Sequence, residues 1–95
     1  SIWFNFSKIC TVPRSQKDYL AIAEDFKTVM ISDVLAMKPH ETTVVQDFIS
    51  LIDILYDHKV RVIISSQVGI DQLYTHGRLV FPFMRTMSRL MEMQG

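Results

Sequence analysis

The sequence predicts a small α/β domain, a three-layer module with a short, mainly parallel sheet flanked by helices. Residues 28–32 and 60–65 are apolar runs without polar alternation, which is typical of strands buried on both faces. Between them, apolar residues from Val44 to Tyr56 follow helical spacing. A strand, a helix and a strand joined by a crossover of this length form a parallel βαβ unit, which is normally right-handed.

A further strand and helix are predicted before this unit. In a strand over residues 2–6, successive side chains alternate between the two faces, so Trp3 would point away from the face that carries the other apolar side chains. Ser15 followed by Asp18 resembles a capping box, so we expect a helix over residues 16–26. The apolar side chains that this helix would bury are Tyr19, Leu20, Ile22, Ala23 and Phe26.

The remaining elements are a short helix, a possible further strand and a final helix. Thr43 with Gln46 is a candidate capping box at the start of the long helix. Residues 70–74 predict the short helix, residues 79–81 the strand, and residues 83–93 the final helix. The apolar side of the final helix comprises Phe83, Met84, Met87, Leu90 and Met91.

The composition fits one domain with a hydrophobic core. The 95 residues are 48% hydrophobic and 21% charged, which argues against disorder. A net charge of zero argues against a protein whose main task is to bind nucleic acid directly. The single cysteine, Cys10, excludes an internal disulfide and suits a reducing compartment. No apolar run approaches the roughly 20 residues that span a bilayer, so we expect no membrane span.

The motifs of nucleotide and metal sites are absent. The chain has no G-x-x-x-x-G-K-[ST], no C-x-x-C and no H-E-x-x-H, and its three histidines share no ligand spacing. The strand that leads to Asp33 resembles a Walker B strand, but Val34 stands where a glutamate would follow, so we interpret it as a buried strand ending in a loop. Asp53 and Asp57 share a helical face, where we interpret them as solvated acids. We therefore predict no catalytic residue and no metal site.

The strongest local signal is the pair Arg85 and Arg89, four residues apart on one face of the final helix. Two guanidinium groups that project together can bind phosphate or carboxylate with bidentate geometry. One interpretation is a pair that contacts nucleotide or a neighbouring subunit, and the other is that they pair with the acidic middle of the same domain. Spacing alone favours the second. Met84 and Met91 either fill the core or form an adaptable surface, and an apolar patch is expected if another part of the protein covers it.

The runs of residues 3–6, 9–10, 13–15 and 18–19 resemble the "WFDF…LC…PRS…DY" sequence of ZapE-type AAA+ ATPases, the bacterial cell-division ATPases and their mitochondrial counterparts. The resemblance continues in the same order over essentially all 95 residues, and residues 85–94 match its ending, "RT-x-SRL-x-EMQ".

The resemblance implies that residues 1–95 are a single C-terminal domain of a longer Mg-ATP-hydrolysing ATPase, whose Walker A and B segments lie outside this chain. ATP and magnesium are then cofactors of the parent protein, and this part alone is expected to be inactive. It would pack on the rest of the parent or on a neighbouring subunit of a homo-oligomer, with Arg85 and Arg89 as candidate nucleotide or subunit contacts. The alternative is a protein-binding module without catalytic residues that recognises a partner such as a cell-division component. The implied location is the bacterial cytoplasm or, alternatively, the mitochondrial matrix.

The sequence departs from the family pattern at several positions. Lys27 stands where the family has histidine, and Leu35 where it has the proline of a Val-Pro-x-Met turn. Gln46 and Asp47 replace an Arg-Arg pair on the long helix. Losing two arginines there weakens any expectation that this helix binds phosphate.

Overall fold

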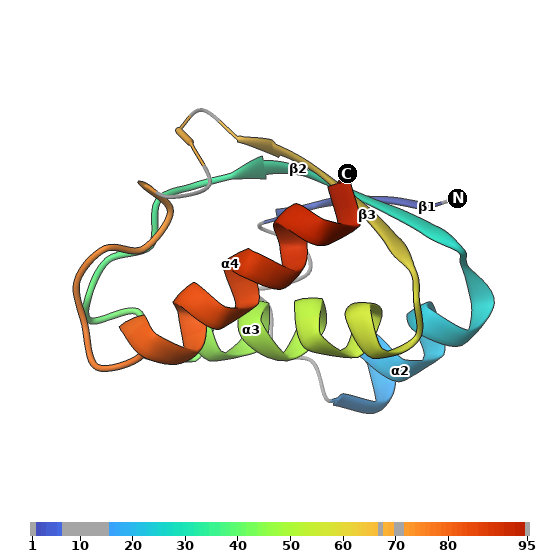
Figure 1. Cartoon of the computed structure of the whole chain (residues 1–95), viewed down its shortest axis with the longest axis horizontal. Coiled ribbons are helices and arrows are strands. Elements are labelled where there is room, and N and C mark those ends of the chain that lie inside the picture. The colour runs from blue at the N-terminus through green and yellow to red at the C-terminus, as the bar shows by residue number, and fades with distance from the viewer. Residues whose placement is uncertain (1, 7–15, 67, 70–71, 95) are drawn as a thin grey trace.

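The computed structural model describes residues 2–6, 16–66, 68–69 and 72–94. Its elements, in chain order, are β1 (Ile2–Asn5), α2 (Gln16–Asp25), β2 (Thr28–Val34), α3 (Thr42–Asp57), β3 (Arg61–Ser66) and α4 (Val80–Gln94). The three strands form one parallel sheet in the order β1-β2-β3 (Figure 1). The predicted α/β class and its parallel sheet are therefore confirmed.

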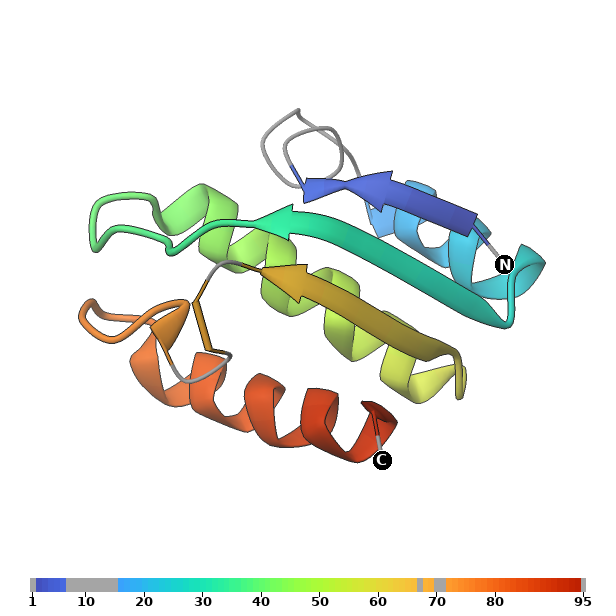
Figure 2. The same ribbon diagram turned by 90° about the horizontal axis from the view of Figure 1, so that it is seen from above.

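The helices that connect the strands lie on one face of the sheet. Both crossovers step one strand in the same direction, and crossovers of the same hand that advance in one direction place their helices on the same side. Figures 1 and 2 show α2 and α3 on one side of the strands and α4 beside β3. The described elements thus form two layers, and none of them supplies the third layer that the sequence predicted.

The core lies between the sheet and α3. Val29, Ile31 and Val62 are at most 1% exposed on the helix-facing side of the sheet. Opposite them, α3 buries Val45, Phe48, Leu51, Ile52 and Leu55. The Phe48 ring lies 5.8 Å from the Phe6 ring and 6.1 Å from the Phe83 ring, measured between centroids. These aromatic contacts join the end of β1, α3 and α4 into one core.

The further strand predicted at residues 79–81 is wrong, because α4 already begins at Val80. The Phe83 amide donates to the Leu79 carbonyl over 2.9 Å, which closes the first helical turn. Pro82 lies within that turn, where its missing N–H leaves no helical hydrogen bond unmade. Of the predicted short helix at 70–74, residues 70–71 lie outside the described residues, and residues 72–74 do not form a helix beyond a tight turn in which the Gln72 amide donates to the Gly69 carbonyl.

Two predictions about the helices also need correction. The capping box at Thr43 is wrong, because α3 begins at Thr42 with Glu41 as its N-cap and no side-chain cap. The Glu41 carboxylate instead accepts a hydrogen bond of 2.9 Å from the Lys38 amide. Leu20 was expected in the core but is 37% exposed. The predicted cap at Ser15 and the cysteine at position 10 lie outside the described residues.

Candidate functional site

A network of polar contacts joins α3 to α4 around Asp53. The Arg89 Nη1 atom donates to Asp53 Oδ1 over 3.0 Å, and the Thr86 hydroxyl donates to the same oxygen over 3.4 Å. Thr86 is buried on the inner face of α4. The Asp53 and Arg89 side chains are 35% and 34% exposed, so the ion pair is partly screened by solvent. One carboxylate thus anchors two residues of the facing helix.

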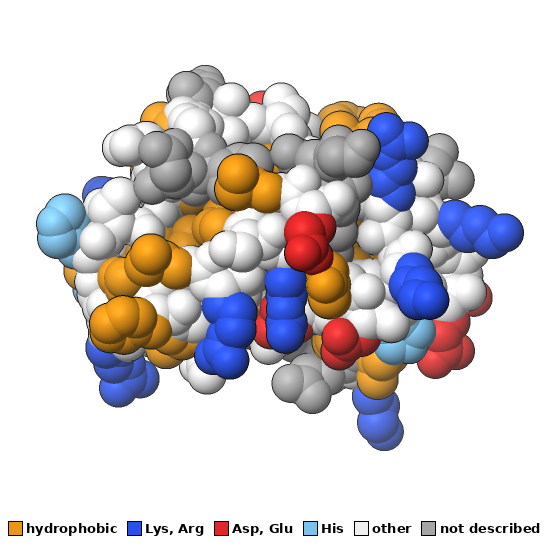
Figure 3. Space-filling model, in the orientation of Figure 1, with side chains coloured by type: hydrophobic (Ala, Val, Ile, Leu, Met, Phe, Trp, Pro, Cys, Tyr) orange, Lys and Arg blue, Asp and Glu red, His pale blue; other side chains and the backbone are white. Residues whose placement is uncertain are grey.

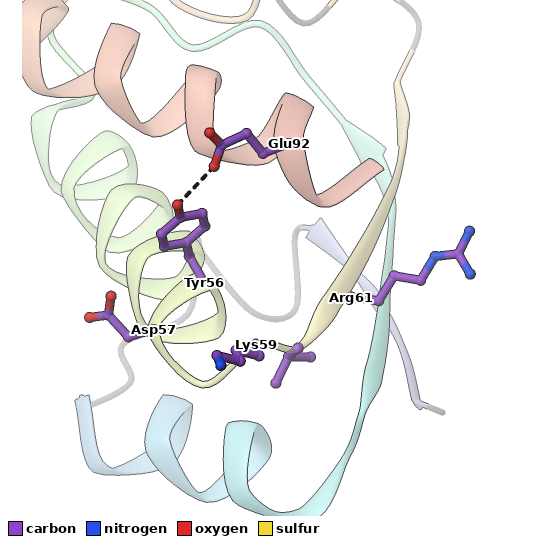
Figure 4. A pocket seen from close by; sticks show the side chains of 6 residues that line it. Tyr56, Asp57, Lys59, Arg61 and Glu92 are labelled. Atoms are coloured by element: carbon purple, nitrogen blue, oxygen red, sulfur yellow. Dashed lines mark hydrogen bonds between the residues drawn. The ribbon is translucent and has the colours of Figure 1, made fainter. Parts of the chain in front are cut away.

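Tyr56 extends this network by one helical turn. The Arg89 guanidinium carbon lies 5.1 Å from the centre of the Tyr56 ring, and the Tyr56 hydroxyl donates to Glu92 Oε2 over 2.8 Å (Figure 4). That hydrogen bond and the negative charge of Glu92 raise the pKa of Tyr56, while the positive charge of Arg89 opposes the shift. Tyr56, Thr86 and Glu92 were not singled out from the sequence. For Thr86 and Glu92, the sequence did contain a signal, because they lie three residues before and three residues after Arg89 and therefore near it on the same helix.

The structure separates the two arginines that the sequence paired. Arg89 contacts the acidic middle of the chain through Asp53, which is the second of the two interpretations. Asp53 is therefore not a freely solvated acid, whereas Asp57 is exposed as predicted. The Arg85 side chain is exposed and makes no ion pair or hydrogen bond with the described part of the chain. A contact with nucleotide or with a second subunit stays a prediction for Arg85 and Arg89.

The outer side of α4 carries an apolar stripe beside Arg85. Phe81, Met84 and Met91 are 85%, 59% and 63% exposed, so the two methionines do not fill the core, whereas Met87 is 7% exposed and does. Phe81 lies three residues before Met84 and four before Arg85, so the helix places the Phe81 side chain next to both of them. Figure 3 shows hydrophobic side chains gathered over the first turns of α4 with basic side chains next to them. We call Phe81, Met84 and Met91 the outer stripe.

Two hollows are lined by described residues away from the outer stripe. The larger, about 520 Å³, is lined by Tyr56, Asp57, Lys59, Val60, Arg61 and Glu92. Two acidic and two basic residues line it. Figure 4 shows the Asp57 and Arg61 side chains pointing away from each other on opposite sides. The charges of this hollow are therefore mixed, and its basic residues do not form a cluster suited to binding phosphate. The smaller, about 300 Å³, lies beyond the end of β2. Within the described ranges, no three or more His, Cys, Asp or Glu residues are grouped so that they could hold a metal ion.

Asp33 forms the polar end of β2. The Asn5 side-chain amide donates to Asp33 Oδ2 over 2.9 Å, which links the ends of β1 and β2. The φ angle of Asp33 is 57°, a left-handed conformation that aspartate tolerates better than most residues. Ligands of open α/β sheets bind where the strand order reverses, and the order β1-β2-β3 has no such reversal. The structure therefore fits the interpretation of Asp33 as the end of a strand.

The positions that depart from the family pattern lie mostly on the surface. Lys27, Leu35 and Gln46 are exposed. Asp47 is half-buried on α3, and its burial raises the pKa of the carboxyl group. None of the four contributes to the contacts around Asp53.

Comparisons with known proteins give one consistent result. A family model described as AFG1-like ATPase matches residues 1–95. The chain is 39% identical over 91 residues to "Cell division protein ZapE" of Escherichia coli (strain K12), covering 96% of this chain and 24% of that protein. It is 30% identical over 122 residues to "Lactation elevated protein 1 homolog B" of Danio rerio, covering 95% of this chain and 24% of that protein.

A third relative, "Uncharacterized protein C115.02c" of Schizosaccharomyces pombe (strain 972 / ATCC 24843), is 29% identical over 120 residues, covering 97% of this chain and 26% of that protein. The chain therefore spans about a quarter of the length of these relatives. No solved structure gives a significant match. Among the described residues, no helix is long and apolar enough to cross a membrane.

Proposed function

Because the chain belongs to the AFG1-like ATPase family, we propose that it is the C-terminal domain of a longer ATPase and that it presents Arg85 to a nucleotide or to a neighbouring subunit. The match over residues 1–95 and the quarter of each relative that the chain spans support the first part. The parent protein then hydrolyses ATP with magnesium and assembles as a homo-oligomer, in the bacterial cytoplasm or alternatively in the mitochondrial matrix.

The residues present do not fit an ATP or magnesium site. The sequence lacks a phosphate-binding glycine loop, and the described residues lack a cluster of metal ligands. Asp33, the carboxylate at the end of β2, accepts a hydrogen bond from Asn5 within the same sheet. We therefore assign ATP and magnesium to the part of the parent protein outside this chain.

The proposed role of Arg85 rests on the contrast between the two arginines. Arg89 is neutralised by Asp53, whereas Arg85 projects from the same helix without a partner among the described residues. A free guanidinium beside the exposed Phe81 and Met84 suits a contact between two protein surfaces, because exposed apolar patches mark such contacts. There it would donate paired hydrogen bonds to a phosphate or a carboxylate.

Magnesium-dependent ATP turnover of the full-length parent with Arg85→Ala tests this role. We expect turnover to fall by at least about tenfold while the thermal unfolding midpoint stays unchanged, since the variant loses a charged contact either to the nucleotide phosphates or to the neighbouring subunit. Arg78→Ala is the matched control, because Arg78 is also exposed and has no described partner, but it precedes α4. Arg85→Lys should recover only part of the activity, because lysine lacks the bidentate geometry.

Unchanged turnover in Arg85→Ala would contradict the proposal. If binding to a partner protein failed in the same variant, the domain would instead be a protein-binding module. The outer stripe favours this second candidate, since exposed methionines adapt to varied partners. One relative carries the name "Cell division protein ZapE", so a cell-division component is the first partner to test.

A further inference from the structure

The face of the sheet that points away from the helices carries an apolar row between two polar rows. Trp3 lies beside Met30 and Met30 beside Ile63, so the row crosses all three strands. These side chains are 63%, 39% and 42% exposed. We call them the open-face row. Figure 2 shows the strands from this side, with no described helix in front of them.

Polar residues bound the open-face row along the strands. On one side of the row, Thr28 and Arg61 pair with each other, two residues before Met30 and Ile63. On the other side, Asn5 and Ser65 lie two residues after Trp3 and Ile63. An apolar centre with a polar rim is the usual anatomy of a contact region between packed protein surfaces. An all-parallel sheet also normally has both faces covered. The open face is therefore built like a surface that another element covers.

The described helices of the two crossovers do not supply that element. Each crossover advances in the same direction and places its helix on the face that α2 and α3 already cover. The width of the open-face row indicates which kind of element could cover it. Two strand spacings of about 4.8 Å make about 10 Å, which is the diameter of one α-helix with its side chains.

We propose that one amphipathic helix, from the part of the parent ATPase outside these 95 residues, packs along β2 over the open-face row and completes a three-layer sandwich. The relatives are about four times as long as the matched segment, so the parent has ample chain to provide it. This inference rests on the proposed function only in taking the chain as one domain of a longer protein.

Methionine oxidation in the folded full-length parent tests the contact. Peroxide reacts with accessible thioethers, and peptide mass spectrometry reads each methionine separately. Met30 is 39% exposed in this domain, whereas Met87 is buried at 7% and serves as the internal standard for protection. We expect Met30 to react as slowly as Met87, at least about tenfold more slowly than in the unfolded parent.

Each other outcome overturns the proposal. Oxidation of Met30 as fast as in the unfolded parent would show that the face is open in the whole protein. Protection that disappears on dilution would show that a second copy of the chain, and not a helix of the same chain, covers the row.

A pair of substitutions gives an independent measurement on the full-length parent. Met30→Glu places a charge in the centre of the row, and Ser65→Glu places the same charge in the polar rim of the same face. We expect Met30→Glu to lower the midpoint of thermal unfolding and Ser65→Glu to leave it unchanged. Equal midpoints would contradict the contact. Arg85→Ala turnover is measured separately, so the proposed role of Arg85 can fail while Met30 remains protected.

Discussion

At the scale of single residues, Asp53 explains why two distant parts of the sequence are found together. It lies on α3, and its carboxylate accepts hydrogen bonds from Thr86 and Arg89 on α4. The ending that resembles the ATPase family therefore contributes contacts within the domain as well as the free arginine at position 85. Arg89 and Arg85 share a helical face in the sequence, but Arg89 bonds to α3 through Asp53, and no described contact joins the Arg85 side chain to α3.

Removing the Asp53 carboxylate tests this role. We expect Asp53→Ala to lower the free energy of unfolding by about 1–2 kcal/mol, because the buried Thr86 hydroxyl and the half-buried Arg89 both lose their acceptor. Asp57→Ala, one turn later on the same helix and exposed, should change it by less than about 0.5 kcal/mol. Urea unfolding of both variants makes the comparison, and equal losses would mean that the Asp53 contacts add no stability.

The Tyr56 hydroxyl predicts a dependence on alkaline pH. Its hydrogen bond to Glu92 raises the pKa of Tyr56 in the folded state above the ordinary value of about 10. The neutral phenol thus stabilises the fold fully below about pH 10, and this contribution is lost as pH rises through the folded pKa. Wild type should lose stability above that pH more steeply than Tyr56→Phe, as measured by urea unfolding. In Glu92→Gln, the tyrosinate absorbance should report a lower pKa for Tyr56, and an unchanged pKa would exclude Glu92 as the cause.

The sequence predicted part of this network. Pairing of the arginines with the acidic middle was one of two interpretations, and it is confirmed for Arg89. The role of Asp53 was missed because helical periodicity placed it opposite the apolar side of α3, where solvent was the default neighbour. Periodicity within one helix cannot show that a second helix covers the margin of its polar side.

At the scale of elements, α4 shows where local pattern becomes ambiguous. The apolar residues 79–81 read equally well as a short strand or as the start of a helix. Pro82 was compatible with both, since proline is accepted in the first helical turn and at strand ends. The structure decides in favour of the helix and leaves Phe81 85% exposed. The longer runs that became β2, α3 and β3 were predicted well, because buried strands and a helix of four turns have distinct periods.

The turn before α4 depends on Gly77. Its φ angle of 140° is rare for residues with a side chain, and an added Cβ would overlap the Tyr74 hydroxyl. Tyr74 is buried, and its ring lies 5.3 Å from the Phe83 ring at the start of α4. We expect Gly77→Ala to reduce the free energy of unfolding by about 1–3 kcal/mol in thermal or urea unfolding.

A second substitution separates the two causes of this loss. The Tyr74 hydroxyl is buried and has no hydrogen-bond partner among the described residues, so Tyr74→Phe alone should be nearly neutral. Combined with Gly77→Ala, it should recover part of the stability by removing the overlapping oxygen. No recovery would assign the whole loss to the backbone angle. Full stability of Gly77→Ala would contradict this account of the turn.

At the scale of the whole molecule, the described elements form a parallel sheet with α2 and α3 on one face. The sequence predicted the α/β class and a third layer, since the runs at residues 28–32 and 60–65 lack the polar alternation of half-exposed strands. In the structure, Met30 and Ile63 from those runs lie on the open face. The apolar runs and the uncovered face are reconciled if the third layer comes from elsewhere in the parent protein.

Magnesium-dependent ATP hydrolysis, measured on the full-length parent beside the 95-residue chain, tests whether the nucleotide site lies outside residues 1–95. We expect an active parent and an inert 95-residue chain, because this chain has no phosphate-binding glycine loop in its sequence and no group of metal ligands among its described residues. Hydrolysis by the 95-residue chain alone would contradict this assignment of ATP and magnesium, since a complete nucleotide site would then have to lie within residues 1–95.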